Sequence, residues 1–336
     1  MICLPSESFR DFPTETAEQI RPVLDALTSP SLFVVSGAGL AVPIIPPMSI
    51  LAWQLALAYL QLGSFPAGIA SRSELRDRLL PAPKALFTGN RVDYLGDAPA
   101  KLDGWQGQLV LTASDEALSA LFQVKIYRPL KSSTPSNYRI FGYVQPPALL
   151  FDFNNDTLLA NYCKPPHIVL NPHGKIDRRF LEHPEFDLFF HAATDYGLQL
   201  PNFSQIWLPR PEPKWITQRH EYNLARYYLT QRGHFLLLVG YSFGRQPSGG
   251  IDDAESFEFF REILKRFPRR IVVVDPSPEH VAGLFEDALR QRIYACKLYW
   301  NHLAKAACLA MDETPGAPSL LAVISRIARH YDERTR

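Results

Sequence analysis

The stretch that decides the fold is Phe33-Val34-Val35-Ser36-Gly37-Ala38-Gly39-Leu40-Ala41. Its first part is a short, apolar, β-branched run, which is typical of a buried strand. The run stops at Gly37 and Gly39, where glycine allows the backbone to turn tightly and to approach a ligand closely. A helix after such a turn would present free amides and a positive dipole end to a phosphate. Because a plain turn after a strand can also contain Gly-x-Gly, the rest of the chain must decide between these interpretations.

The composition indicates a globular protein. The chain has 336 residues, of which 46% are hydrophobic and 21% charged, enough for one large domain or two smaller ones. The net charge of +1 gives no global attraction to nucleic acid or to a membrane surface. A basic group between residues 261 and 270 is interpreted as a solvated helix end. No signal peptide or membrane-spanning run is visible, so we expect a cytoplasmic protein.

The cysteines give no sign of a metal centre. None of the four forms a CxxC pair, so we expect free, buried thiols and no zinc.

Predicted strands and helices alternate along the chain. Short apolar runs predict strands at 32–36, 148–153, 168–170, 188–191, 205–208, 235–239 and 270–274. Helical spacing predicts helices at 14–27, 49–62, 114–127, 217–231, 254–267 and, in two pieces, 279–331. This pattern predicts an α/β fold: a Rossmann-like parallel sheet with helices on both faces. We expect one domain over residues 1–300, with a mostly helical insertion at about 50–135, and a C-terminal helical extension over 301–336.

Polar or glycine-rich residues follow the predicted strands. Ligands of parallel sheets bind at the carboxyl ends of the strands, so these positions are the candidate site. They are Gly37 and Gly39, Asn154 to Asp156, His173, Gly240 to Ser242, and Asp275.

In this order, the segments resemble motifs of the Sir2 (sirtuin-like) superfamily across about residues 31–280. The matches are Gly37-Ala38-Gly39-Leu40-Ala41 with Pro47 to the GAG-x-S motif, Asp152-Phe153-Asn154-Asn155-Asp156 to T-x-N-x-D, His173-Gly174 to the catalytic HG, Gly240-Tyr241-Ser242-Phe243 to the GYSF form of bacterial Sir2-like proteins, and Val272-Val273-Val274-Asp275-Pro276 to the strand that meets the adenine ribose. The chain departs from the family at Ala41, Asp152 and Asp275, where serine, threonine and asparagine are common. It also lacks the zinc ribbon of the deacetylases.

The resemblance implies a function. Sir2-like proteins without the ribbon occur in bacterial anti-phage systems, where they cleave NAD, so we expect hydrolysis of NAD to nicotinamide and ADP-ribose. NAD would be the substrate, and no zinc would be needed. Because such an activity must be restrained, we expect a homo-oligomer or a partner protein such as a HerA-type ATPase or an Argonaute-type protein. The alternatives are an NAD-dependent protein deacylase, which the missing zinc cysteines disfavour, and a non-catalytic NAD-binding scaffold subunit.

Two residues are the predicted catalysts. His173 is the candidate general base because the pKa of histidine lies near neutrality, with His167 as the alternative; a lone histidine can also be structural. Asn154 is a neutral amide that can orient a water or a ribose hydroxyl beside a developing cation. A register error of one would make Asn155 the amide, and an Asx-turn is the structural alternative.

The remaining candidates would hold the cofactor. The amides of the glycine turn would face the pyrophosphate, Gly240 and Ser242 the ribose, and the Asp275 carboxylate the ribose hydroxyls. Asp275 can instead be read as the start of a helix. The full predicted cofactor set is Gly37, Ala38, Gly39, Pro47, Asp156, Gly240, Ser242 and Asp275.

Overall fold

The computed structural model describes part of the chain. The described residues are 17–41, 70–71, 73–74, 136–144, 147–154, 158–163, 165–173, 219–232, 235–245, 251, 253–267 and 269–312. The elements expected at 49–62, 114–127, 188–191 and 205–208 lie outside these ranges, as does nearly all of the expected insertion. So do the candidate residues Pro47, Asn155, Asp156 and Gly174.

The centre of the fold is a six-stranded sheet in the order β3-β2-β1-β4-β5-β6, in which every neighbouring pair is parallel. The strands are β1 (Leu32–Ser36), β2 (Leu149–Asp152), β3 (Ile168–Leu170), β4 (Phe235–Val239), β5 (Arg270–Asp275) and β6 (Ile293–Lys297). This sheet confirms the predicted α/β, Rossmann-like fold. The strand order reverses between β1 and β4, and open α/β sheets bind ligands at the carboxyl side of such a switch point.

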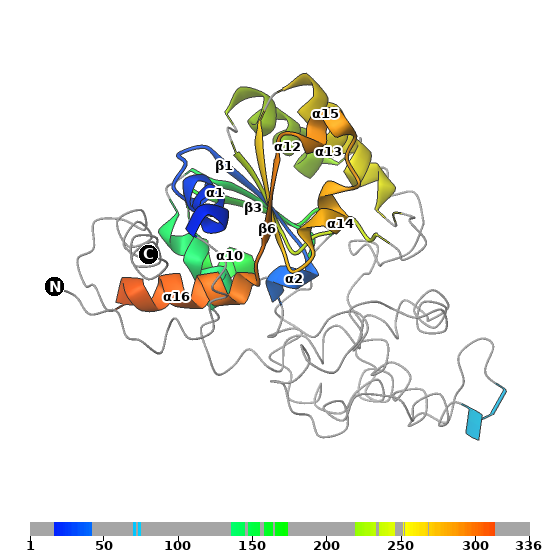
Figure 1. Cartoon of the computed structure of the whole chain (residues 1–336), viewed down its shortest axis with the longest axis horizontal. Helices are drawn as coiled ribbons and strands as arrows, with labels where there is room; N and C mark the ends of the chain where they lie inside the picture. The colour runs from blue at the N-terminus through cyan, green and yellow to red at the C-terminus, as the bar shows by residue number, and fades with distance from the viewer. Residues whose placement is uncertain are drawn as a thin grey trace.

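Helices cover the sheet and its carboxyl edge (Figure 1). They are α1 (Ala17–Leu27), α2 (Ala38–Ala41), α9 (Ser136–Arg139), the 3₁₀ helix η2 (Ile140–Tyr143), α10 (Leu158–Tyr162), α12 (His220–Gln231), α13 (Ala254–Arg266), α14 (Pro278–Ala282), α15 (Asp287–Arg290) and α16 (Trp300–Asp312). The helix α1 contacts β4, β5 and β6, and Figure 1 shows it across the sheet from α12 and α13. Within the described ranges, no helix combines the length and apolar character needed to cross a membrane.

An aromatic cluster fills the space between the sheet and α13. Phe33 of β1 and Phe151 of β2 face α13, whereas their neighbours in each strand face the other side of the sheet. The ring centroid of Phe260 in α13 lies 6.0 Å from that of Phe33 and 5.8 Å from that of Phe151. All three rings are buried. Because both sets of alternate positions in β1 are buried, the strand reads as a continuous apolar run in the sequence.

One element contradicts the sequence prediction. Residues 293–297 lie in the helical region expected from 279 onward, but they form β6, which pairs with β5 from Ile271 to Asp275. The prediction was wrong because β6 is an edge strand with exposed residues, including Tyr294, so its apolar pattern is weak. Pairing with β5, which is decided by tertiary structure, makes this segment a strand.

Asn137 connects three elements near the carboxyl edge of the sheet. Its Nδ2 donates a hydrogen bond of 2.8 Å to the carbonyl oxygen of Leu40 in α2. Its own carbonyl oxygen accepts a hydrogen bond of 2.9 Å from Nε1 of Trp300, the first residue of α16. The Trp300 ring also stacks on Phe141, with centroids 5.3 Å apart. Through Asn137, the beginning of α16 is therefore linked to α2.

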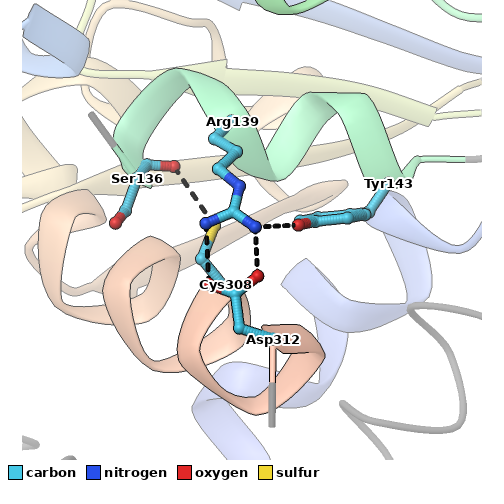
Figure 2. A network of polar contacts seen from close by, with 5 residues as sticks. All are labelled: Ser136, Arg139, Tyr143, Cys308 and Asp312. Atoms are coloured by element: carbon cyan, nitrogen blue, oxygen red, sulfur yellow. Dashed lines mark hydrogen bonds and ion pairs between the residues drawn. The ribbon is translucent and has the colours of Figure 1, made fainter. Parts of the chain in front are cut away.

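A polar network joins the other end of α16 to α9 (Figure 2). Arg139 donates from Nη1 to Asp312 Oδ2 at 2.7 Å and from Nη2 to the other carboxylate oxygen. It also donates to the Tyr143 hydroxyl at 2.6 Å. The hydrogen bonds of this pair raise the pKa of Arg139 and lower that of Asp312. Because both side chains are partly exposed, water screens the pair and limits its contribution to stability.

These two contacts predict different costs of mutation. Asn137→Ala leaves a buried carbonyl without its donor and should lower the free energy of unfolding by about 1–3 kcal/mol. Arg139→Met removes an exposed ion pair and should cost about 1 kcal/mol or less, with a smaller effect in high salt. Urea unfolding of both variants at low and high salt measures the two losses in free energy of unfolding. A larger, salt-independent loss for Arg139→Met would contradict the ranking.

Candidate functional site

The glycine turn lies at the carboxyl end of β1, and the helix α2 begins within it, at Ala38. Two of the three amides expected to face a pyrophosphate donate within the protein instead. Gly37 N donates to Val239 O at 3.2 Å, and Gly39 N donates to Gly240 O at 2.9 Å. These bonds tie the turn after β1 to the end of β4. Phosphate binding at this turn stays a prediction.

Close packing explains why these positions are glycines. A Cβ on Gly37 would lie 2.5 Å from Cδ2 of Tyr241, and one on Gly39 would lie 2.6 Å from Cα of Gly240. Gly240 itself has a φ of +56°, which is left-handed backbone that glycine adopts readily. The motif that indicated a close approach to a ligand thus produces a close approach between two strand ends.

Asp152 is the last residue of β2, and it is fully buried. Its Oδ1 accepts three hydrogen bonds: from Ser36 Oγ at 2.8 Å, from Asn154 Nδ2 at 2.9 Å and from Asn154 N at 3.2 Å. Buried carboxyl groups require such partners. Asp152, one of the three departures from the Sir2-like motifs, therefore connects β1 to the amide of Asn154.

The amide of Asn154 has a defined orientation. Its Nδ2 donates to the carbonyl oxygen of Gly37 at 3.0 Å as well as to Asp152. Both partner atoms are acceptors, so the amide must point its nitrogen toward them. These two bonds use both protons of Nδ2, so Oδ1 is the atom through which Asn154 would contact a substrate. The bond from the backbone amide of Asn154 to Oδ1 of Asp152 is an Asx-type contact made by the Asp152 side chain. The Asx-turn of Asn154 itself would involve residues outside the described ranges, and the bond to Gly37 is a tertiary contact.

His173 follows β3 and faces α13. Its Nε2 lies 3.1 Å from Oδ2 of Asp253, and its ring packs edge-on against Phe153 with centroids 4.7 Å apart. The side chain of His173 is 13% exposed and that of Asp253 is 5% exposed. A mostly buried imidazole beside a carboxylate is a common arrangement for a base in an active site.

The alternative histidine lies elsewhere. His167 precedes β3, at the amino end of the sheet, where its Nδ1 accepts a hydrogen bond of 3.3 Å from the amide of Ala148. Burial lowers the pKa of His167, which favours the neutral ring that accepts this bond. The geometry therefore favours His173 at the candidate site.

Contacts connect Asn154 to His173. Asn171, two residues before His173, donates from Nδ2 to the carbonyl oxygen of Asn154 at 3.2 Å. Phe153, which contacts the imidazole, stacks on Tyr241 with centroids 4.0 Å apart and an interplanar angle of 9°. The amide of Asn154 faces the glycine turn, whereas the imidazole faces α13. A substrate that uses both groups must reach from the turn toward α13.

The carboxylate that faces His173 was not among the predicted site residues. It belongs to Asp253, which directly precedes the helix predicted at 254–267. Tyr241 donates a hydrogen bond to Oδ2 of Asp253, and Ser256 donates to Oδ1 at 2.8 Å. The hydroxyls of Ser256 and Tyr222 are 2.6 Å apart, which extends the network into α12. The signal in the sequence is an aspartate, Asp253, that follows the GYSF segment. The sequence does not show its partner, because His173 lies 80 residues earlier, after β3.

The other cofactor candidates lie on neighbouring strand ends. Ser242 belongs to the turn after β4, where its carbonyl oxygen accepts from Arg245 N at 3.0 Å. Asp275 ends β5, and its Oδ1 accepts from the amide of Ser277 at 2.8 Å, just before α14. Ser277, not Asp275, is at the N-cap position of α14, so Asp275 lies in the turn that leads into this helix without capping it. Ribose binding stays a prediction. Burial raises the pKa of Asp275, and the Ser277 amide offsets part of that shift.

The described thiols are free and buried: Cys163, Cys296 and Cys308. Burial raises the pKa of each to about 12, so none is a thiolate at neutral pH. In the part of the chain that the structure describes, no group of three or more His, Cys, Asp or Glu residues could hold a metal ion.

Two comparisons with known protein sequences identify no relative. A scan against protein-family models finds no matching family, and a search of curated proteins finds no match. The Sir2 resemblance therefore rests on the ordered motifs alone.

Gly240 provides a test of the contact between the two turns. In Gly240→Ala the new Cβ would lie 2.3 Å from Cα of Gly39, at a φ of +56°. Strain and overpacking should lower the free energy of unfolding by about 2–5 kcal/mol. In the control Gly142→Ala, the nearest contact is 3.3 Å, and the loss should stay within about 1 kcal/mol. Equal losses in urea unfolding would contradict the close packing.

Asp275 should be a residue that lowers stability at neutral pH. Because its folded-state pKa is raised, the folded protein favours the protonated form, and ionisation above the ordinary value of 3.8 costs stability. Asp275→Asn keeps an oxygen for the Ser277 amide and removes the charge. The variant should therefore be more stable than the wild type at pH 7, with the difference vanishing below about pH 4. Urea unfolding across this range tests the sign, and a less stable variant at pH 7 would contradict it.

Proposed function

We propose that this protein is an NAD⁺ hydrolase that cleaves the bond between nicotinamide and ribose, and that it acts in bacterial anti-phage defence. The observation that carries the proposal is the orientation of Asn154, whose amide is bound to Gly37 at the switch point of a Rossmann-like sheet. The resemblance of the ordered motifs to those of Sir2-like proteins suggests NAD as the substrate. The pairing of His173 with Asp253 supplies a candidate base.

The chemistry requires little acid catalysis. Nicotinamide is a cationic leaving group that departs neutral, while positive charge develops on the ribose. An amide oxygen such as Oδ1 of Asn154 can accept a hydrogen bond from a ribose hydroxyl and can face this charge without adding a full negative charge. His173 would take the proton of the attacking water.

The proposal predicts the effect of two substitutions. His173→Ala and Asn154→Ala should each lower the rate of NAD loss by about 10²-fold or more, because each removes a group that acts at the reacting sugar. The full chain, with and without the products of neighbouring genes, is incubated with NAD, and the products are identified by mass spectrometry.

The control for this experiment is His167→Ala, which alters a histidine at the opposite end of the sheet and should keep wild-type turnover. Full turnover in both His173→Ala and Asn154→Ala would overturn the site. The function itself would fail if the wild-type chain consumed no NAD under any of these conditions.

One observation favours a second candidate, a non-catalytic NAD-binding subunit. The amides of Gly37 and Gly39 already donate to Val239 and Gly240, so the turn offers fewer donors to a pyrophosphate. NAD that raises the melting temperature without any product would support this candidate over the hydrolase.

A further inference from the structure

Asp253 occupies the N-cap position of α13, yet its side chain makes no capping hydrogen bond. An aspartate at this position ordinarily accepts from the first free amides of its helix. Here the carboxylate faces side chains instead: Oδ2 lies 3.1 Å from Nε2 of His173 and accepts from the Tyr241 hydroxyl, and Oδ1 accepts from Ser256. An N-cap residue whose side chain binds other side chains instead of the helix amides departs from the local rule, and such departures often occur at functional sites.

The environment keeps Asp253 an acceptor. The residue is 4% exposed, and a buried carboxylate is tolerated only when it is paired and hydrogen-bonded. Burial, together with the negative charge of Asp253, raises the pKa of Tyr241 well above its ordinary value, so the phenol keeps its proton and donates it. Burial also raises the pKa of Tyr222, which reaches Asp253 through Ser256; the charges of Asp253 and Glu255 add to this shift, and Arg219 opposes it.

The backbone before α13 is also held in an unusual conformation. Phe243 has a φ of +55°, which is uncommon for a bulky residue, and its ring is fully buried. Its ring packs against Phe257 with centroids 5.4 Å apart. Its carbonyl oxygen accepts a hydrogen bond of 3.0 Å from the amide of Asp253. Strained backbone of this kind persists where the surrounding packing holds it, often beside functional groups.

We infer that Asp253 is a positioning residue for His173: it fixes the imidazole orientation and stabilises the cation that forms when His173 takes a proton. The inference rests on the proposed function for the reaction that this proton transfer serves. Tyr241 and Ser256 hold the carboxylate in place, and Asp253 itself does not touch the substrate.

The proposed step begins with a neutral His173 ring that carries its proton on Nε2, 3.1 Å from Oδ2 of Asp253, and its lone pair on Nδ1. The water oxygen bonds to the ribose carbon, the bond to nicotinamide breaks, and its electron pair leaves with neutral nicotinamide. The water proton moves to Nδ1, the imidazolium is stabilised by ionised Asp253, and the proton is then released to solvent. One water is consumed and one proton is released per NAD⁺.

The test uses Asp253→Asn in the full chain. The substitution should lower kcat for NAD loss by about 10- to 100-fold with little change in KM, since orientation and charge act on the reacting step. Removing the opposite charge should also lower the pKa of the His173 imidazole by about one to three units. That pKa is followed by NMR of ¹³C-histidine-labelled protein, with His173→Gln assigning the signal. Asp252→Asn, which removes the neighbouring carboxylate in the sequence, is the matched control.

Tyr241→Phe keeps the inference testable should Asp253→Asn fail to fold. This substitution removes one hydrogen-bond donor from Asp253, so more of the negative charge acts on His173. It should therefore raise the pKa of the imidazole, whereas Asp253→Asn should lower it. An unchanged His173 pKa in a folded variant would overturn the inference.

The two proposals fail separately. An Asp253→Asn variant with wild-type kcat and pH profile overturns the positioning role while the hydrolase stands. A wild type that consumes no NAD overturns the hydrolase, and the NMR measurement still decides whether Asp253 controls His173.

Discussion

The buried carboxyl group of Asp152 is the contact on which the candidate site depends. Three donors converge on one of its oxygens, from the ends of β1 and β2, so the turn after β1 and the Asn154 amide are held in one geometry. Because a buried polar group without partners is costly, these bonds cannot be given up without loss of stability. The amide of Asn154 then binds Gly37, which fixes the turn itself.

A second buried carboxyl group organises the other side of the site. Asp253 sets the position of His173 as Asp152 sets that of Asn154, and hydroxyl groups bind both carboxyls: Ser36 on one side, Tyr241 and Ser256 on the other. The stacked rings of Phe153 and Tyr241 connect the two centres. Each candidate catalytic group thus follows a strand end: Asp152, the last residue of β2, contacts Asn154 two residues later, whereas Asp253, just before α13, contacts His173 after β3. This arrangement keeps the reacting groups rigid without placing them on the same element.

Much of the sheet could be predicted because its strands are short, buried and apolar. The expected ranges 32–36 and 235–239 coincide with β1 and β4, since burial on both faces leaves a strong local signal. The expected range 168–170 coincides with β3, an edge strand whose Ile168 is exposed but whose run is apolar and β-branched. The strand β6 was missed, because an edge strand with an exposed Tyr294 carries little of that signal. Asp152 was noticed only as a departure from a motif, since nothing local shows that Ser36 would donate to it.

The sequence by itself determined the class of fold, the strand ends at which polar residues gather and the close approach at Gly37 and Gly39, because each depends on local backbone and burial preferences. The tertiary structure alone decided what those features contact. The glycines pack against Tyr241 and Gly240, and His173 meets a carboxylate 80 residues further along the chain. Such pairings depend on strand order and on the helix laid over the sheet, and these arise from the packing of the whole domain rather than from any one segment.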